Sequence, residues 1–360
     1  MKNLRNEFPV LQQYTYLNTA SSGLLYDTLL DFRQEHDLDF LIGGSKFRDS
    51  QQQFLNSVRT TIAEFFGAST KNTILTPNFS TGLNTILQDI SKDQKVLLLD
   101  DDYPSINFSV RSKGFDTCYA KIDEHLEQNI MSSIEQHKPD IFIFSIVQYI
   151  SGIKIDLDII KQLKNSYPEL LIIADGTQFC GTAVFNFANS GIDILGCSGY
   201  KWLLGGYGNG FLLFQDGMLD HLTPKMYIEA AKNENYDSSY ISLPARFECG
   251  HLDTFNFGSL EYSLRHLSKI GLSEIEQKIK MLGSYSKEEL QKLNLLGSEV
   301  VSRKKHSTIL NIKGDQKLFL HLKEHGIITS LRGYGVRISL HFYNTIEDID
   351  QLLTQLHRYR

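Results

Sequence analysis

Lys201 stands between two apolar segments, an unusual place for a lysine. Residues 192–197 before it and 211–214 after it are apolar enough for buried strands, and a glycine-rich turn at 205–210 follows it. A lysine is almost never fully buried unless it is paired or functional. Small neighbouring residues would let a ligand approach its amine. Lys201 is therefore a candidate for an amine that forms an imine with a carbonyl group, and the alternative is a lysine in a surface loop.

A carboxylate at the end of another apolar run gives that amine a partner. Asp175 follows residues 171–174, and Gln178 stands shortly after it. An acid at a strand end with a buried lysine downstream is the pattern of an enzyme that uses pyridoxal 5'-phosphate (PLP), in which the lysine holds the aldehyde and the acid pairs with the pyridinium nitrogen. Gln178 would donate to the phenolate oxygen of the ring. The alternative is that Asp175 only caps the next turn.

Hydroxyl groups beside an expected helix start mark a candidate phosphate site. Pro77 breaks the preceding element, and a helix is expected to begin near Ser80. Free backbone N–H groups and hydroxyls at a helix N-terminus bind phosphate. Ser198, shortly before Lys201, would add a second hydroxyl. Taken alone, the stretch around Ser80 is more commonly an ordinary Ser/Thr helix cap.

Two loops could complete the walls of such a site. Tyr103 comes soon after a buried run at 96–99, where an aromatic ring can stack on a flat cofactor. Followed by Pro104, it could equally begin an ordinary turn. Residues 16–23, which include Asn18, form a small, polar, glycine-containing loop that would line a site or be a simple turn.

An arginine on a predicted strand suits a substrate with a carboxylate. Alternation along residues 336–342 places Arg337, Ser339 and His341 on one face. The guanidinium fork of Arg337 matches the two oxygens of a carboxylate. The alternative is a half-exposed strand whose polar residues face solvent.

The elements that must position these residues predict a parallel sheet covered by helices. Apolar runs of strand length lie at 96–99, 141–147, 171–174, 192–197 and 211–214, and helix-period segments such as 156–166 separate several of them. Runs without polar alternation, separated by helices, are typical of a mostly parallel sheet with both faces buried. Ligands bind at the carboxyl ends of such strands, where Asp175, Tyr103 and Lys201 are expected to meet.

The chain after about residue 260 predicts a smaller α/β domain. Helices are expected at 257–270, 275–293, 316–325 and 345–359, the last with Thr345 as N-cap, and strands at 308–312 and 336–342. Length also favours two domains. We expect a large domain at 15–260, a small domain at 261–360 and an N-terminal segment, 1–14, that packs on the small domain.

Composition is that of an ordinary globular protein and excludes several function classes. The chain has 360 residues, of which 41% are hydrophobic and 22% charged. Its formal net charge of -6 gives no basic surface for nucleic acid. No apolar signal core begins the chain and no run is long enough for a membrane span. The cysteines are widely spaced, three in or beside apolar runs, which indicates free thiols and a cytoplasmic protein.

A metalloprotease is a distant alternative. The stretch His321-Leu-Lys-Glu-His325 matches the H-x-x-E-H pattern, and the two histidines would share one face of a helix. The segment ends at Gly326 like a surface helix with a glycine cap, and little chain remains to supply a further ligand. We expect no metal site.

The ordered set of motifs resembles the class V aminotransferases over nearly the whole chain. This fold-type I PLP-dependent family includes cysteine desulfurases, selenocysteine lyases, kynureninases and isopenicillin N epimerase-like proteins. The matching stretches are Tyr16-Leu-Asn18-Thr-Ala20, Asp102-Tyr-Pro-Ser105, Ala174-Asp-Gly-Thr-Gln178, Ser198-Gly-Tyr-Lys-Trp202, Arg246-Phe-Glu-Cys-Gly250 and Arg337-Ile-Ser-Leu-His-Phe-Tyr-Asn-Thr345. The resemblance implies an α/β fold of the fold-type I transferases, with a large domain whose mostly parallel sheet lies between helices and a smaller C-terminal α/β domain.

The family implies a role for each matched residue. Lys201 would carry the cofactor as an internal aldimine and then move protons, while Asp175 would hold the pyridine nitrogen. The cofactor contacts would come from Phe79 (its N–H), Ser80, Tyr103, Asp175, Gln178, Ser198, Tyr200 and Lys201. Arg337 and Asn18 would bind the substrate, a small amino acid or 2-oxo acid. A homodimer with sites at the subunit interface is implied, and His251, where many relatives have threonine, would reach the phosphate of the partner subunit.

Departures from the family pattern bear on the reaction. Cysteine desulfurases have His where this chain has Tyr103, and their persulfide cysteine lies on a loop ahead of the carboxylate-binding arginine. Here residues 330–337 contain no cysteine, and the nearest in sequence is Cys249. We therefore predict that the chain is not a persulfide-forming desulfurase. An aminotransferase is the first expectation, with a PLP-dependent lyase or epimerase as the alternative.

Overall fold

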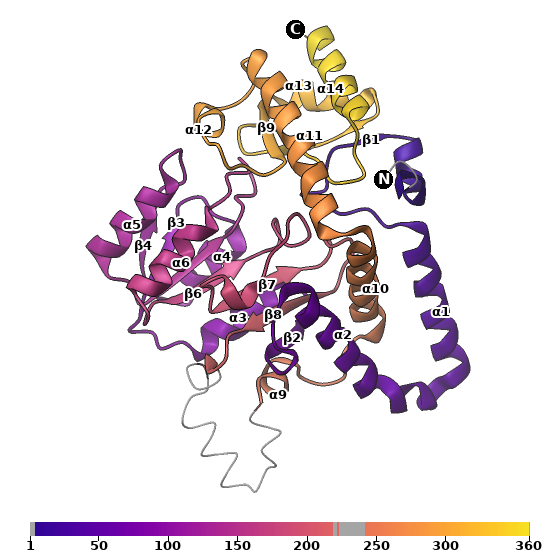
Figure 1. Cartoon of the computed structure of the whole chain (residues 1–360), viewed down its shortest axis with the longest axis vertical. Helices are drawn as coiled ribbons and strands as arrows, with labels where there is room; N and C mark the ends of the chain where they lie inside the picture. Colours follow the sequence, from indigo (N-terminus) through magenta and orange to yellow (C-terminus); the bar gives the residue numbers. More distant parts are fainter. Residues whose placement is uncertain (1–3, 219–221, 223–241, 360) are drawn as a thin grey trace, which may run out of the picture.

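The computed structural model describes residues 4–218, 222 and 242–359, and its largest element is a seven-stranded sheet (Figure 1). In order across the sheet the strands are β2 (Thr73–Thr76), β8 (Gly210–Phe214), β7 (Ile194–Ser198), β6 (Leu171–Asp175), β5 (Ile141–Ser145), β3 (Lys95–Leu99) and β4 (Asp116–Ala120). Neighbours from β7 to β4 pair in parallel, whereas β8 is antiparallel to β7 and β2. The prediction of a mostly parallel sheet is confirmed.

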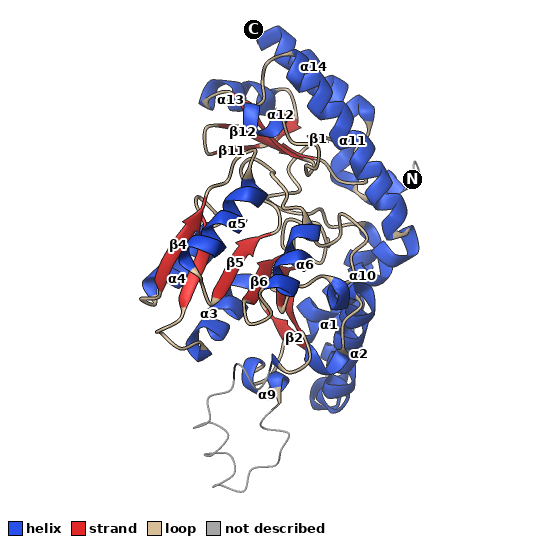
Figure 2. Cartoon of the chain, turned by 60° about the vertical axis from the view of Figure 1, so that its left-hand side comes forward, coloured by secondary structure: helices blue, strands red, loops and turns tan. Residues whose placement is uncertain are grey.

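Helices cover both faces of this sheet (Figure 2). The helices on these faces are α2 (Gln51–Phe66), α3 (Phe79–Asp89), α4 (Pro104–Ser112), α5 (Leu126–His137), α6 (Leu157–Ser166) and α9 (Leu243–Phe247). Outside them, α10 (Thr254–Ile270) packs on α2, and α1 (Asp27–Gly43) packs on α10. Successive strand residues enter different apolar clusters: Leu97 and Phe142 pack in the cluster that holds α5 and α6, and Leu98 and Ile143 in the one that holds α3 and α4. Both faces are therefore buried, as the unbroken apolar runs require.

A smaller three-stranded sheet follows in the C-terminal part. Its strands, in the order β11 (Ser330–Arg332), β12 (Gly335–Ser339) and β9 (Ile309–Lys313), are antiparallel. The helices of this part are α11 (Leu272–Lys292), α12 (Ser298–Val301), α13 (Gln316–Glu324) and α14 (Ile346–Tyr359). Thr345 accepts a hydrogen bond from Asp348 N at 3.3 Å, as expected of an N-cap. The predicted boundary between residues 260 and 261 falls inside α10 and stays a prediction.

The N-terminal segment lies against this C-terminal part. β1 (Thr15–Tyr16) pairs in parallel with β10 (Ile327–Ile328). Ahead of it, Arg5 donates to the Asp348 carboxylate at 2.8 and 2.9 Å. The pairing of β1 with β10 brings the loop at residues 16–23 to the edge of β12. There Asn18 forms a backbone bridge with Ser339.

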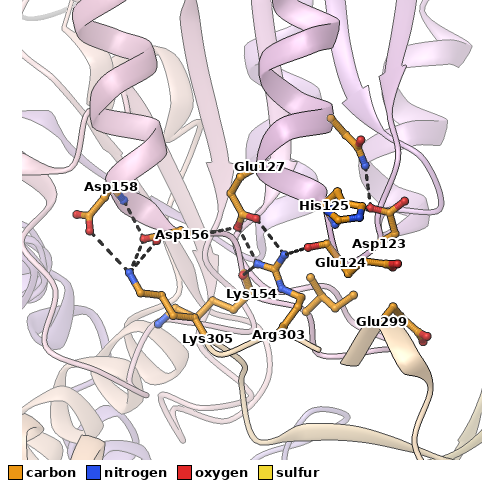
Figure 3. Close-up of polar contacts among 12 residues, drawn as sticks. Asp123, Glu124, His125, Glu127, Lys154, Asp156, Asp158, Glu299, Arg303 and Lys305 are labelled. Atoms are coloured by element: carbon orange, nitrogen blue, oxygen red, sulfur yellow. Dashed lines mark hydrogen bonds and ion pairs between the residues drawn. The ribbon is translucent and has the colours of Figure 1, made fainter. Parts of the chain in front are cut away.

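Ion pairs connect the region of the large sheet with the C-terminal part (Figure 3). They join residues of α5 and of the segment before α6 to the segment that follows α12. Arg303 donates to the Glu127 carboxylate at 2.7 and 2.9 Å and to Lys154 O at 2.8 Å. Nearby, Lys305 contacts Asp156 at 2.7 Å. Arg303 is 9% exposed, so its guanidinium depends on these partners.

Two predicted strands end earlier than expected. The strand predicted at 141–147 stops at Ser145, because the chain then turns back so that Val147 bridges Lys154. The strand predicted at 336–342 stops at Ser339, because Asn344 Oδ1 accepts from His341 N at 2.8 Å in a turn that leads into α14. The alternative of a half-exposed strand is wrong: all of β12 is buried.

In the described part of the chain, no helix combines the length and apolar character needed to span a bilayer. Its cysteines are unpaired, as predicted: Cys118, Cys180 and Cys197 are buried and Cys249 is exposed.

Candidate active site

A cavity of about 360 Å³ lies where the parallel strands of the large sheet end. Asp175 and Ser198 are the last residues of β6 and β7, and both line it. Parallel strands bring their carboxyl ends to one edge of a sheet, which is why residues far apart in sequence meet there. Of the predicted residues, the following line the cavity: Phe79, Ser80, Tyr103, Asp175, Gln178, Ser198, Tyr200 and Lys201.

Lys201 is a buried amine on the turn after β7. It is 6% exposed, so the alternative of a surface lysine is wrong. Burial lowers the pKa of Lys201 to about 8, while the charge of Asp175 acts in the opposite direction. Gly23 packs on this turn so closely that a Cβ there would lie 2.0 Å from Lys201 O. The loop at 16–23 therefore helps to hold the lysine in place.

Asp175 is a carboxyl group at the floor of the same cavity. Its Oδ1 accepts a hydrogen bond from Thr177 N at 2.8 Å, and the residue is 6% exposed. Burial raises the pKa of Asp175 to about 6, against the effect of the Thr177 hydrogen bonds and the Lys201 charge. A cation beside this carboxylate would restore its ionised form. The site is thus suited to a protonated heterocyclic nitrogen.

Gln178 is held by hydrogen bonds at both ends of its amide. Trp202 Nε1 donates to Gln178 Oε1 at 2.7 Å, and Gln178 Nε2 donates to Ala20 O at 3.0 Å. These contacts leave the second N–H of Nε2 for another acceptor. That remaining donor agrees with the predicted contact to a ring oxygen.

The start of α3 forms the opposite end of the cavity. Asn78 caps the helix by accepting from Thr81 N at 2.9 Å, which replaces the cap predicted near Ser80. Phe79 N donates to Ser198 Oγ at 3.0 Å, so the two predicted phosphate ligands touch. Backbone N–H groups at a helix start, together with the hydroxyls of Ser80 and Ser198, suit a phosphate group.

Tyrosines form much of the cavity wall. The Lys201 Nζ lies 5.5 Å from the ring centroid of Tyr103 and 5.4 Å from that of Tyr200. Tyr149 packs edge-on against Tyr103, with ring centroids 5.1 Å apart, and Tyr207 stacks on Tyr200 at 5.1 Å. The backbone of Tyr103 donates to the buried carboxylate of Asp102 at 2.6 Å.

Sequence reasoning missed several residues that line the cavity. These are Pro77, Asn78, Ser105, Ser145, Val147, Tyr149, Thr177, Tyr207 and Gly208. A signal existed for Tyr149, because it follows the buried run of β5 as Tyr103 follows that of β3. Tyr207 gave no such signal, because it lies on the glycine-rich turn after Lys201.

Arg337 lies beside the cavity wall in the middle of β12. It is 3% exposed and donates to Tyr149 O at 2.7 Å and to Ser21 Oγ at 2.6 Å. Its Nε has no hydrogen-bond partner among the described residues, and neither has the buried Oδ1 of Asn18. Burial lowers the pKa of Arg337 to about 10, and the nearby charge of Arg332 lowers it further. Unused donors on a buried guanidinium suit an anionic ligand.

His251 is the predicted cofactor residue that the single chain does not bring to the cavity. It is exposed and lines another pocket, of about 280 Å³, with Arg48, Arg59 and Glu248. Its predicted contact with a partner subunit's phosphate stays a prediction.

The two histidines of the metalloprotease alternative lie beside each other at the end of α13, with ring centroids 4.4 Å apart and ring planes tilted by 42°. Within the described residues, no three His, Cys, Asp or Glu side chains gather as metal ligands.

The residues around the cavity fit the cofactor that the sequence predicts. The buried amine of Lys201 matches the aldehyde of PLP, and the carboxyl group of Asp175, with its raised pKa, matches the ring nitrogen. The free amide N–H of Gln178 matches the ring oxygen, and the start of α3 with its hydroxyls matches the phosphate. Tyr103 and Tyr200 supply flat surfaces beside them.

Comparisons with known proteins agree with this fit. The family model for class-V aminotransferases matches residues 42–352. An uncharacterized aminotransferase of Bacillus subtilis is 23% identical over 98% of this chain and 96% of its own length.

Solved structures share the fold. A cysteine desulfurase from Thermococcus onnurineus superposes with a TM-score of 0.85 at 18% identity, covering 99% of this chain and 97% of that one. A mutant of C-DES with glycine covalently linked to the PLP cofactor superposes with a TM-score of 0.84 at 19% identity, covering 98% of each chain.

Proposed function

The chain belongs to the class-V aminotransferase family, whose cofactor is pyridoxal phosphate, and we propose that it transfers the amino group of a small amino acid to a 2-oxo acid. The observation that carries the proposal is the single cavity that holds both Lys201 and Asp175, with the start of α3 at its other end. The relative named as an aminotransferase supports the same reaction.

Each cavity residue has a part in holding the cofactor. Lys201 would bind it covalently through the side-chain amine, and Asp175 would pair with the ring nitrogen. Phe79 N–H, Ser80 and Ser198 would hold the phosphate, Gln178 the ring oxygen, and Tyr103 and Tyr200 would flank the ring. When bound, PLP supplies an electron-poor ring that stabilises negative charge on the substrate Cα.

Lys201 would have a second role, as the group that moves a proton. Its side-chain amine would take a proton from the substrate Cα and return it at another atom. A pKa of about 8 suits this task near neutral pH, because a general base works best when its pKa lies close to the working pH. Asp175 contributes by keeping its charge beside the ring nitrogen.

Arg337 would bind the substrate's α-carboxylate. Two of its nitrogens are fixed by Tyr149 O and Ser21 Oγ, so the guanidinium is positioned before the substrate arrives. Pre-positioned donors lose little entropy on binding, which favours a bidentate contact. Asn18, whose Oδ1 lacks a partner among the described residues, is proposed to line the same subsite.

A PLP-dependent lyase or epimerase is the second candidate. The solved structure most like this chain among those described above is named a cysteine desulfurase, which favours a lyase. However, β11 and β12 are joined by a two-residue turn, Gly333 and Tyr334, that carries no cysteine. A persulfide mechanism therefore lacks its nucleophile at this place, and we propose a reaction without one.

Spectra of the holoenzyme with single amino acids test the reaction. We expect the visible band of the bound cofactor to be lost with an amino acid and restored by a 2-oxo acid. A band that persists while pyruvate accumulates would favour the lyase, and a band that persists while the Cα inverts would favour the epimerase. Lys201→Ala should lower turnover by about 10²- to 10⁴-fold without changing the far-ultraviolet circular dichroism, which reports the backbone fold. Full activity of that variant would refute the mechanism.

A further inference from the structure

A second arginine shares a face of the small-sheet hairpin with Arg337. In the β11–β12 pair, Ser330 lies opposite Arg337 and Arg332 lies opposite Gly335. Residues opposite each other point to one face, and so do residues two apart on a strand. Ser330 and Arg337 both contact Ser21 Oγ, at 3.4 and 2.6 Å, which identifies that face as the one toward the loop at 16–23.

The backbone sets the spacing of the two arginines. Arg332 is the diagonal neighbour of Arg337, and such residues have Cα atoms about 7–8 Å apart. Two guanidinium groups carried by backbone positions this close can converge on the two ends of one small dicarboxylate. The hairpin turn is also held in place, because Gly333 packs on Ile150, where an added Cβ would lie 2.8 Å from the side chain.

Arg332 has no carboxylate partner within the described residues. Its Nη1 donates a long hydrogen bond of 3.4 Å to the carbonyl of its neighbour Leu331. Other arginines of the chain are paired: they are Arg5, Arg59, Arg246, Arg265 and Arg303. The carboxylate that reaches this hairpin, Glu299, accepts from Tyr334 OH at 3.3 Å instead.

Arg332 is close enough to act electrostatically on the candidate site. After burial, its charge is the largest cause that lowers the pKa of Arg337. Its charge also contributes, behind burial and Arg337, to the lowered pKa of Lys201. The charges of Arg332 and Arg337 therefore act on one region, and a second anionic group in the ligand would relieve their mutual repulsion.

We propose that Arg332 binds a second carboxylate, at the side-chain end of the substrate, so that the preferred substrates are dicarboxylic α-amino acids and their 2-oxo acids. The inference rests on the proposed function, in which Arg337 takes the α-carboxylate. Arg332 is exposed, and its guanidinium can donate to both oxygens of a carboxylate. A carboxamide of the same shape offers only one acceptor oxygen and no charge.

Calorimetry of the PLP-loaded protein with unreactive acids tests this without turnover. We expect succinate to bind about 10- to 100-fold more tightly than butyrate, the range that one charge-assisted hydrogen-bonded contact supplies. Arg332→Gln should remove most of this difference and leave butyrate binding unchanged, and Arg332→Lys should keep part of it. Arg358→Gln, which removes an exposed arginine at the end of α14, is the matched control and should behave as the wild type.

Two results would overturn the inference: equal binding of succinate and butyrate by the wild type, or an equal loss of both in Arg332→Gln. The proposed function is tested separately by mixing the holoenzyme with aspartate and asparagine and following the cofactor band. If both amino acids react equally and succinate is not favoured, Arg332 has no such role while transamination stands. If neither reacts yet succinate binding depends on Arg332, the second-carboxylate site stands and transamination fails.

Discussion

At the scale of residues, the site combines the amine of Lys201 with the carboxyl group of Asp175, and the pKa values of the two groups are closer together than those of free lysine and aspartate. Burial lowers the pKa of Lys201 to about 8 and raises that of Asp175 to about 6. Each group also favours the charged form of the other, since their charges are opposite. The balance leaves a substantial part of Lys201 neutral near physiological pH, which is the form that attacks an aldehyde.

This balance predicts a pH dependence for capture of PLP by the apoprotein. At pH values below the Lys201 pKa of about 8 the amine is mostly protonated, so capture of PLP should be about tenfold slower at pH 7 than at pH 9. The midpoint of this pH dependence should lie near 8, whereas that of a free lysine lies near about 10.4. In Asp175→Asn the midpoint should move to lower pH, because the carboxylate charge raises the Lys201 pKa. Stopped-flow absorbance measures both, with the exposed Asp158→Asn as the control. A midpoint that moves upward in Asp175→Asn would contradict this electrostatic account.

At the scale of elements, strand ends and short connections decide what the cavity contains. The carboxyl ends of β3, β5, β6 and β7 are each followed by a residue that lines the cavity, and the loop at 16–23 closes on the turn after β7. The C-terminal region contributes through β12, which carries Arg337. Its position relative to the large sheet therefore matters for substrate binding, and the contacts around Arg303 help to maintain it (Figure 3).

The Arg303–Glu127 pair should stabilise this arrangement more than its exposed neighbour does. The side chains of Arg303 and Glu127 are 7% and 19% exposed, so Glu127→Gln leaves a buried guanidinium short of charge compensation and should lower the free energy of unfolding by roughly 2–4 kcal/mol. Lys305, 60% exposed, pairs with Asp156 in solvent, and Lys305→Ala should cost about 0–1 kcal/mol. Urea unfolding measures both variants. Equal losses would mean that burial does not distinguish the two pairs.

At the scale of the whole molecule, an apolar surface near the end of α1 suggests association. Phe40, Leu41 and Ile42 are 57%, 80% and 77% exposed, and Leu38, on the same helix, is 52% exposed. Contiguous exposed apolar side chains of this size commonly mark protein contact sites. The homodimer implied by the sequence stays a prediction, and this surface is where we expect two copies to meet.

Sedimentation velocity tests the homodimer. We expect the wild type to sediment with twice the chain mass, and the double variant Leu41→Glu/Ile42→Glu to dissociate, because two charges would be buried without partners in the contact. Leu320→Glu, on α13 and 43% exposed, controls for the loss of an exposed leucine elsewhere. A wild type that remains a single chain at all concentrations would refute the prediction. If only Leu320→Glu dissociates, the interface between the two copies does not include the end of α1.

The sequence by itself determined the cofactor and most of the elements, because both depend on residues that are close together in the chain. The apolar runs that precede Asp175 and Lys201 are strands, and the motif around each residue is contiguous. The ends of strands were less predictable where they depend on contacts with residues further along the chain. At Ser145 and Ser339 the chain leaves the sheet because of turns formed with residues further along, whereas the apolar pattern continues.

Only the tertiary structure decided which distant residues share the cavity and which do not. Tyr149 meets Tyr103, and Arg337 meets the Tyr149 carbonyl from a different sheet, because the topology brings separate strand ends and a C-terminal hairpin to one place. The same chain leaves His251 exposed and away from Lys201. Local propensity and motif spacing carry no information about such pairings, since these depend on how the sheets are ordered and docked.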